Sequence, residues 1–245
     1  MSDSANERRQ YVRYAYFRVD PAWRGLPPED REAGKRDLTE AVREFSERML
    51  ILRTYSLIGL RHDADFMFWQ VSERLDDLVQ FAARINQTAF APYLTSPYAY
   101  LSMTRRSTYV KDHVHEGQEG ARLNMRPGRG KYLFVYPFVK TRDWYLLPMQ
   151  ERQKMMDGHF EVGHRYPRVK INTSYSFGLD DQEFMVAFES DYPEDFVDCV
   201  MDLREIPGSR YTLRDTPIFT CELTTIEEML ERLGGVEGRV GATRE

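Results

Sequence analysis

Three side chains in the middle of the chain could do chemistry together: a tyrosine and a lysine on one apolar segment, and a histidine on the next. Tyr136 and Lys140 lie four residues apart in YLFVYPFVK, and His159 lies in PMQERQKMMDGHF. A histidine can ligate a haem iron. A tyrosine beside a lysine can do redox and proton chemistry, because a partly buried lysine shifts its pKa readily. These three residues are the candidate functional site.

Two elements must position these residues. The first segment alternates like a strand, which places Phe134, Tyr136, Phe138 and Lys140 on one face. The second has the periodicity of a helix over about residues 149–164. Each residue type also has a purely structural explanation, since strand aromatics fill cores and a lysine at the end of an apolar stripe extends to solvent. A lone histidine on a helix face is more often hydrogen-bonded than bound to a metal, so both interpretations stay open.

The chain repeats itself. GLRHDADFMFWQVS in the first half resembles GLDDQEFMVAFES in the second, with one residue dropped. Each half follows the order β-α-β-β-α-β of a ferredoxin-like unit. We therefore predict an α+β protein in which two tandem ferredoxin-like units form a dimeric α+β barrel-type fold within a single chain. The predicted parts are an N-terminal unit (10–105), a polar linker (106–130) and a C-terminal unit (131–235).

Composition narrows the class of protein. The net charge of −5 argues against a general nucleic-acid binder. The two cysteines, Cys199 and Cys221, have neither CxxC nor metal-site spacing and suit a reducing compartment. No apolar run approaches the roughly 20 residues of a membrane span, and the N-terminus has no apolar signal segment. We expect a soluble cytoplasmic protein.

The remaining histidines are less informative. His62 lies in a turn and His164 near the end of the predicted helix, so both are expected to be exposed. His113 and His115 form an HVH pair in the predicted linker. Such a pair can bind zinc, but no cysteine or third histidine stands at ligand spacing.

Several motifs in one order resemble the chlorite dismutase-like haem protein family. The segments YPFVKTRDWYLLPMQERQKMMDGH and VKINTSYSFGLDDQEF carry the resemblance, which extends from about residue 11 to about 233. Within the family, the similarity is greatest to coproheme decarboxylases of the actinobacterial type. The resemblance implies paired ferredoxin-like units, which agrees with the repeat, and a homopentameric assembly.

The resemblance also implies roles. His159 matches the histidine that ligates the haem iron, Tyr136 a tyrosine that becomes a radical, and Lys140 a lysine beside the reacting propionate. The implied reaction is peroxide-dependent: hydrogen peroxide oxidises iron coproporphyrin III, two propionates lose carbon dioxide, and haem b is formed. The porphyrin is then both substrate and cofactor.

One position departs from the chlorite-degrading members of the family, which carry an arginine directly after a Val-Lys pair. Here Ile171 follows that pair and cannot donate a hydrogen bond to an oxyanion, so chlorite degradation is not expected. The actinobacterial branch uses a histidine of the linker as the base that activates peroxide. His113 and His115 are the candidates, and the K-[SD]-H context favours His113.

Four further residues are candidates for binding the carboxylates of coproheme, because arginine and lysine suit carboxylate recognition. Arg129 and Lys131 precede the predicted strand. Arg204 and Ser209 resemble an Arg–Ser pair that binds propionates in the Firmicute type.

Three other functions remain open. A haem peroxidase or chlorite-type enzyme would turn over a phenolic donor or chlorite. A non-catalytic haem-binding protein would keep His159 but would not need Tyr136 and Lys140 together. A cofactor-free ferredoxin-like monooxygenase would not need His159.

Overall fold

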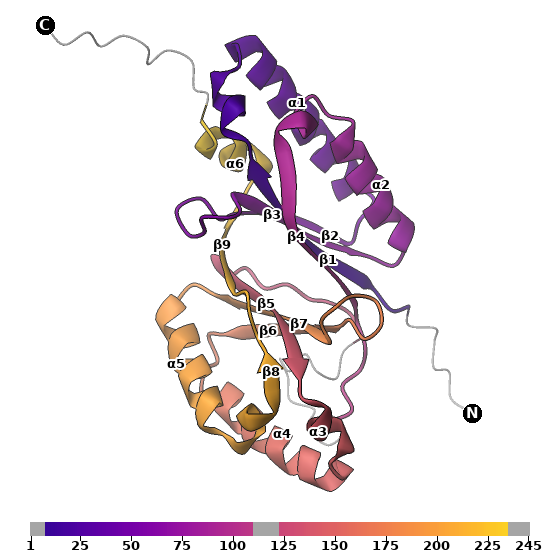
Figure 1. Cartoon of the computed structure of the whole chain (residues 1–245), viewed down its shortest axis with the longest axis vertical. Helices are drawn as coiled ribbons and strands as arrows, with labels where there is room; N and C mark the ends of the chain where they lie inside the picture. The colour runs from indigo at the N-terminus through magenta and orange to yellow at the C-terminus, as the bar shows by residue number, and fades with distance from the viewer. Residues whose placement is uncertain (1–7, 110–122, 235–245) are drawn as a thin grey trace, which may run out of the picture. The chain divides into compact units, whose positions relative to one another are not determined.

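The structure is a computed structural model that describes residues 8–109 and 123–234. The described part of the chain divides into two compact units: the N-terminal unit (residues 13–99 and 223–234) and the C-terminal unit (residues 8–12, 100–109 and 123–222). Figure 1 shows their elements along the chain.

In sequence order, the elements of the first half are β1 (Tyr11–Val19), a 3-10 turn (Pro21–Gly25), α1 (Pro28–Ser46), β2 (Ile51–Ser56), β3 (Phe66–Ser72), α2 (Leu75–Asn86), a 3-10 turn (Ala91–Tyr93) and β4 (Leu94–Met103). Those of the second half are β5 (Tyr132–Lys140), α3 (Arg142–Leu146), α4 (Met149–His164), β6 (Lys170–Tyr175), β7 (Phe184–Ser190), α5 (Pro193–Glu205), the 3-10 turn η4 (Pro207–Tyr211), β8 (Thr212–Arg214), β9 (Phe219–Thr224) and α6 (Ile226–Arg232).

The N-terminal unit has the strand order β4-β1-β3-β2. In Figure 1, α1 and α2 lie side by side against this sheet. Aromatic rings join the layers, because Phe81 of α2 lies 5.4 Å from Phe68 of β3 and 5.2 Å from Phe45 of α1, centre to centre. This strand order, with helices covering the sheet, is that of a ferredoxin-like unit.

The C-terminal unit has the same order, β9-β5-β7-β6. Strand β7 pairs antiparallel with β5 on one side, with Tyr136 opposite Val186, and with β6 on the other, with Thr173 opposite Val186. Helices α4 and α5 contact one another in this unit. The predicted α+β fold with two ferredoxin-like units is therefore confirmed.

The repeat also holds at single residues. Gly59 and Gly178 begin the two similar segments, and both adopt the left-handed backbone, with φ of 79° and 76°. Only glycine takes this conformation without a steric cost. The same local sequence thus makes the same turn ahead of β3 and ahead of β7. The division into residues 10–105, 106–130 and 131–235 stays a prediction.

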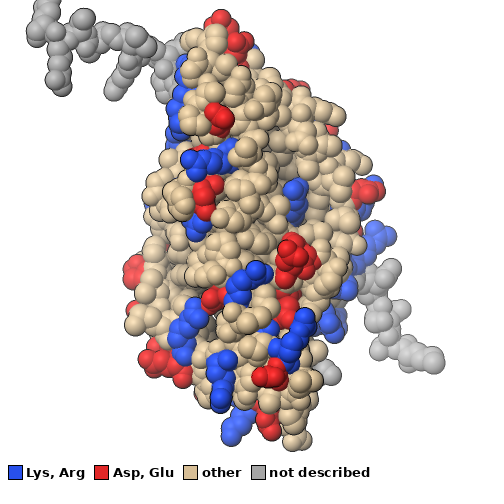
Figure 2. All heavy atoms as spheres, in the orientation of Figure 1, with Lys and Arg blue, Asp and Glu red and all other residues tan. Residues whose placement is uncertain are grey.

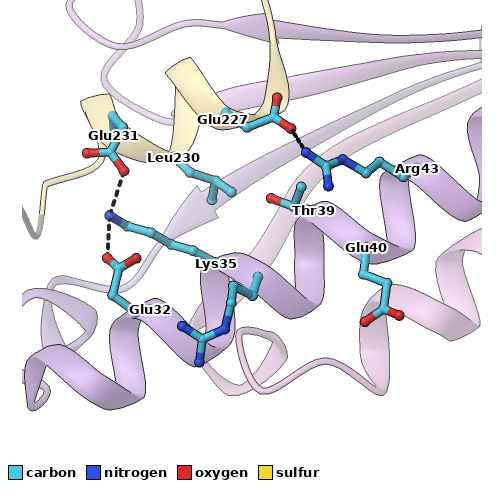
Figure 3. A pocket seen from close by; sticks show the side chains of 9 residues that line it. Glu32, Lys35, Thr39, Glu40, Arg43, Glu227, Leu230 and Glu231 are labelled. Carbon is cyan, nitrogen blue, oxygen red and sulfur yellow. Dashed lines mark hydrogen bonds and ion pairs between the residues drawn. The ribbon is translucent and has the colours of Figure 1, made fainter.

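A charged groove of the N-terminal unit lies between α1 and α6 (Figure 3). Lys35 of α1 is almost fully buried, and its ammonium lies 2.9 Å from Glu32 and 3.1 Å from Glu231 of α6. A buried charge needs such partners, because leaving it unpaired costs several kcal/mol. Farther along, Arg43 and Glu227 are exposed and 2.8 Å apart, a contact that adds little. Lys35 therefore fixes α6 on α1.

The surface shown in Figure 2 carries basic and acidic side chains interspersed. Within residues 8–109 and 123–234, no helix has the length and hydropathy required to cross a membrane.

Candidate functional site

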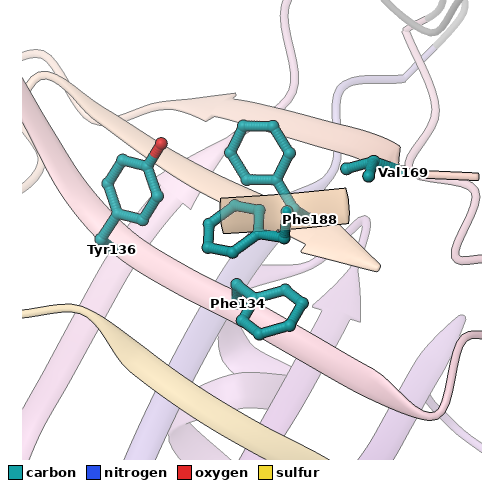
Figure 4. Packing of buried hydrophobic residues seen from close by; sticks show 5 residues of the cluster. Phe134, Tyr136, Val169 and Phe188 are labelled. Atoms are coloured by element: carbon teal, nitrogen blue, oxygen red, sulfur yellow. The ribbon is translucent and has the colours of Figure 1, made fainter. Parts of the chain in front are cut away.

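One face of the β5–β7 sheet carries an aromatic cluster formed by Phe134, Tyr136, Val169, Phe188 and Phe196 (Figure 4). The rings of Phe134 and Phe196 stack at 4.1 Å, so α5 is packed directly on β5. Tyr136 stacks on Phe188 at 6.0 Å. Phe138 packs against the same cluster, which confirms that alternate residues of β5 share this face. Burial raises the pKa of the Tyr136 phenol well above its usual range.

Ile171 lies on this same face. It sits opposite Phe188 in the ladder between β6 and β7, and its side chain packs against the aromatic cluster. Phe188 is in turn opposite Phe134 of β5. Two strand spacings, about 10 Å, therefore separate Ile171 from β5. The side chain extends the apolar face and offers no hydrogen bond.

Lys140 ends β5 at an irregular position, because the pairing with β8 shifts register between Val139 and Lys140. Its ammonium lies over the ring of Trp144, 4.1 Å from the ring centre, and donates to the carbonyl of Gly208 at 3.3 Å. Burial lowers the pKa of this amine to about 8, although the carboxylate of Glu183 acts in the opposite direction. Lys140 is thus a cation at neutral pH whose ammonium is more acidic than that of an exposed lysine.

Glu183 supports this corner of the site. Its buried carboxylate accepts from the backbone amide of Lys140 at 2.8 Å and from the Tyr145 hydroxyl at 2.5 Å. Burial, and then the hydrogen bond to Glu183, raise the pKa of the Tyr145 hydroxyl above its usual range. Glu183 therefore ties α3 to the end of β5.

His159 lies on α4, which spans Met149–His164 as predicted. Glu151 in the first turn complements the helix dipole. Burial, together with the charge of Lys140, lowers the pKa of the His159 imidazole to about 4. The imidazole is therefore neutral at physiological pH, which is the form that binds a metal. His164 is exposed, as predicted.

His159 on α4 is near enough to Lys140 for the lysine charge to lower the pKa of the imidazole, and contacts on two sides hold the helix in place. Asp202 of α5 accepts from the Tyr166 hydroxyl at 2.8 Å and lies 2.9 Å from Arg165, just beyond the end of α4. On the other side, Met155 approaches Gly208, whose carbonyl accepts from Lys140.

Among the four candidate carboxylate binders, Arg204 and Ser209 lie together. The hydroxyl of Ser209 donates to the carbonyl of Arg204 at 2.8 Å, and the Arg204 guanidinium pairs with Asp215. Gly208, the hydrogen-bond partner of Lys140, directly precedes Ser209. Arg204 and Ser209 thus belong to the segment that contacts Lys140.

Arg129 and Lys131 are placed elsewhere. Both are exposed and stand just before β5, at the opposite end of the strand from Lys140. Because a strand rises about 3.3 Å per residue, Lys131 lies nearly 30 Å from Lys140 along β5, and Arg129 lies beyond Lys131. Lys131 pairs with Glu222 at 3.5 Å. Their assignment as carboxylate binders stays a prediction.

His113 and His115 lie outside the described residues, so the distal base stays a prediction. Three residues without a predicted role belong to the described site: Trp144, Glu183 and Asp215. Trp144 and Glu183 lie in the two segments that carry the family resemblance, whereas no pattern in the sequence indicates Asp215. Within residues 8–109 and 123–234, no group of three or more His, Cys, Asp or Glu side chains could hold a metal ion.

The chemistry of these side chains fits an iron porphyrin. The neutral imidazole of His159 on α4 is of the type that ligates haem iron, and the aromatic cluster with Ile171 has the apolar character that a flat macrocycle requires. The cation of Lys140 offers a partner for a carboxylate at the edge of that surface.

Comparisons with known proteins point to one family. The family model described as chlorite dismutase matches residues 31–224. A coproheme decarboxylase of Mycolicibacterium smegmatis is 29% identical over 233 residues, covering 94% of this chain and 97% of that protein. The structure of chlorite dismutase from Candidatus Nitrospira defluvii in complex with imidazole has a TM-score of 0.82 at 28% identity, covering 91% of this chain and 94% of the other. The structure of a haem-binding protein from Thermus thermophilus also has a TM-score of 0.82 at 28% identity, covering 91% of this chain and 94% of the other.

Proposed function

This chain belongs to the chlorite dismutase family, and from that membership we propose that it is a coproheme decarboxylase that converts iron coproporphyrin III to haem b with hydrogen peroxide. The observation that carries the proposal is the joint placement of Tyr136, Lys140 and His159 in one unit. A protein that only holds haem needs the histidine. Oxidative removal of a carboxyl group also needs an oxidisable side chain and a cation for the carboxylate.

Substrate binding would use His159 and Lys140. The neutral imidazole of His159 would ligate the iron, and the macrocycle would lie against the apolar face that includes Ile171. Lys140 would bind the reacting propionate by a charge-assisted hydrogen bond. Its ammonium is held by an aromatic ring and one carbonyl rather than by a side-chain carboxylate, so a propionate could replace the weak carbonyl contact at little cost.

Tyr136 would perform the hydrogen abstraction. Bound iron coproporphyrin supplies the oxidising power when it reacts with hydrogen peroxide. Tyr136 would lose an electron and a proton, then take a hydrogen atom from the β-carbon of the propionate. Burial among Phe134, Phe188 and Phe196 favours the neutral radical over a charged form. Lys140, with a pKa of about 8, is suited both to hold the carboxylate and to supply a proton.

A base for peroxide is also required, and we propose His113 for this role, with His115 as the alternative. We further propose that the enzyme acts in the cytoplasm and assembles as a homopentamer. Sedimentation of the purified protein tests the assembly.

The decisive experiment is to reconstitute the protein with iron coproporphyrin III, add hydrogen peroxide stepwise, and follow the porphyrin mass and the Soret band together. We expect loss of two carboxyl groups in succession, ending in haem b. A stable complex that is only bleached by peroxide would instead indicate a haem-binding protein or a peroxidase. No Soret shift would remove His159 as an iron ligand and, with it, the proposed function.

A further inference from the structure

A tyrosine buried in an apolar cluster can be oxidised to a neutral radical only if its proton has somewhere to go. Phe134, Phe188 and Phe196 around Tyr136 cannot accept a proton. The hydroxyl must therefore communicate with a polar group on another side. This requirement holds whatever the oxidant is.

The structure provides one opening beside Tyr136. A groove of about 210 Å³ is lined by Tyr136 together with α5 and the segment before β9. Its walls are mostly apolar, and they include Phe196, Met201 and Ile218. Among the described residues that line it, Asp215 is the one carboxylate and Arg204 the one cation. The volume has room for several waters, since about 30 Å³ of liquid volume holds one.

We propose that Asp215 receives the phenolic proton of Tyr136 when Tyr136 is oxidised, across the groove that both residues line. The inference rests on the proposed function, because it needs the peroxide-oxidised porphyrin as the electron acceptor. Tyr136 loses one electron to that acceptor, its O–H bond breaks, and the proton passes through groove water to the Asp215 carboxylate. A new O–H bond forms when Tyr136 takes the hydrogen atom from the propionate, and Asp215 releases its proton to solvent.

The charges in the groove suit this role. The Arg204 guanidinium donates a hydrogen bond to the Asp215 carboxylate, which holds both charged groups at the groove. Although burial is the main reason that the pKa of Tyr136 is raised, the charge of Asp215 raises it further and that of Arg204 lowers it. The two charged groups are therefore close enough to the phenol to act on it.

Other groups of the site are less suited to accept this proton. Lys140 is protonated at neutral pH, because its pKa of about 8 lies above it. Glu183 accepts hydrogen bonds from the Lys140 amide and from Tyr145. His159 is committed to the iron in the proposed function. Asp215 thus acts on the reaction through Tyr136, by taking its proton, and does not touch the substrate.

The test compares Asp215→Asn, which keeps the shape but removes the basic charge, with Asp215→Glu, which restores the base. Asp198→Asn is the matched control, since Asp198 is an exposed carboxylate of α5 that does not line the groove. Each variant is loaded with iron coproporphyrin III and mixed with hydrogen peroxide, and the tyrosyl radical is followed by electron paramagnetic resonance. We expect radical formation to slow by about 10²-fold in Asp215→Asn, with recovery in Asp215→Glu and no change in the control.

A second readout needs no porphyrin. The phenol of Tyr136 is titrated by ultraviolet absorbance, as the difference between each protein and its Tyr136→Phe counterpart. Asp215→Asn should lower the pH at which this phenol ionises. If wild type makes haem b and Asp215→Asn forms the radical at the wild-type rate, the inference fails while the proposed function stands. If wild type forms neither radical nor haem b, both fail, and an unchanged phenol titration overturns the inference independently.

Discussion

The ammonium of Lys140 lies 4.1 Å from the centre of the Trp144 ring, and its one hydrogen bond among the described residues goes to the carbonyl of Gly208. The face of an indole attracts a cation but does not neutralise it as a carboxylate would. The charge therefore stays available at the edge of the apolar face that holds Tyr136. The nearby carboxylate, Glu183, bonds to the backbone of Lys140 rather than to its side chain.

Binding of coproheme should depend on the charge of Lys140. Its pKa in the free protein is about 8, so affinity is expected to be constant below this pH and to fall above it, as the ammonium loses its proton. The loss should be roughly tenfold, the value of one charge-assisted hydrogen bond. Fluorescence or Soret titrations of iron coproporphyrin III between neutral and alkaline pH measure the effect.

The variant Lys140→Met should bind more weakly at neutral pH and show no such fall. His159, which the Lys140 charge affects, has a pKa of about 4 and therefore stays neutral over this pH range. An equal pH dependence in wild type and variant would contradict a role for Lys140 in carboxylate binding.

Iron ligation is expected to depend on His159 and not on His164. His159→Ala should abolish the Soret shift, and imidazole added to the solution should restore it, because the lost side chain leaves space for the free ligand. His164→Ala is a matched control on the same helix, since His164 is exposed. With the pKa of His159 near 4, ligation should also be insensitive to pH from neutrality down to about pH 5. Iron binding that survives in His159→Ala without imidazole would refute the assignment.

Periodicity was enough to predict some of this site. Alternation along β5 predicted that Phe134, Tyr136 and Phe138 share a face, and helical spacing predicted α4. The contacts of Lys140 and Arg204 were out of reach, because each depends on irregular backbone. The register shift before Lys140 sets the ring that its ammonium contacts. The 3-10 turn after α5 sets the carbonyl to which Lys140 donates and the hydroxyl that donates to the carbonyl of Arg204. Periodicity carries no information about such positions.

The packing of α5 on β5 should depend on Phe196. Its ring stacks on Phe134 at 4.1 Å and is buried, so Phe196→Ala is expected to lower the free energy of unfolding by about 3–5 kcal/mol. Val197→Ala, at the next and exposed position, should change it by less than about 0.5 kcal/mol. Urea unfolding of the protein without porphyrin makes the comparison. Similar midpoints for the two variants would mean that the stacked pair is not part of the core.

Ile171 should prevent efficient chlorite degradation. Its side chain packs against the aromatic cluster and has no hydrogen-bond donor for an oxyanion. We expect the haem-loaded protein to release no oxygen from chlorite above a haem-only control, as measured with an oxygen electrode. Rapid oxygen release would show that another donor serves the iron and would favour the chlorite-type alternative.

Tyr136→Phe should separate binding from chemistry. The change removes one hydroxyl from a buried ring and leaves its stacking on Phe188 in place, so the affinity for iron coproporphyrin III should stay within about threefold of wild type. Decarboxylation should stop, because phenylalanine has no O–H bond to give up and restore. Tyr132→Phe is the control, since Tyr132 lies on the same strand and packs against the same cluster. Mass spectrometry of the porphyrin after peroxide addition measures both variants. Haem b formed by Tyr136→Phe at the wild-type rate would rule out the tyrosyl mechanism, whereas equal losses in Tyr136→Phe and Tyr132→Phe would attribute the effect to packing.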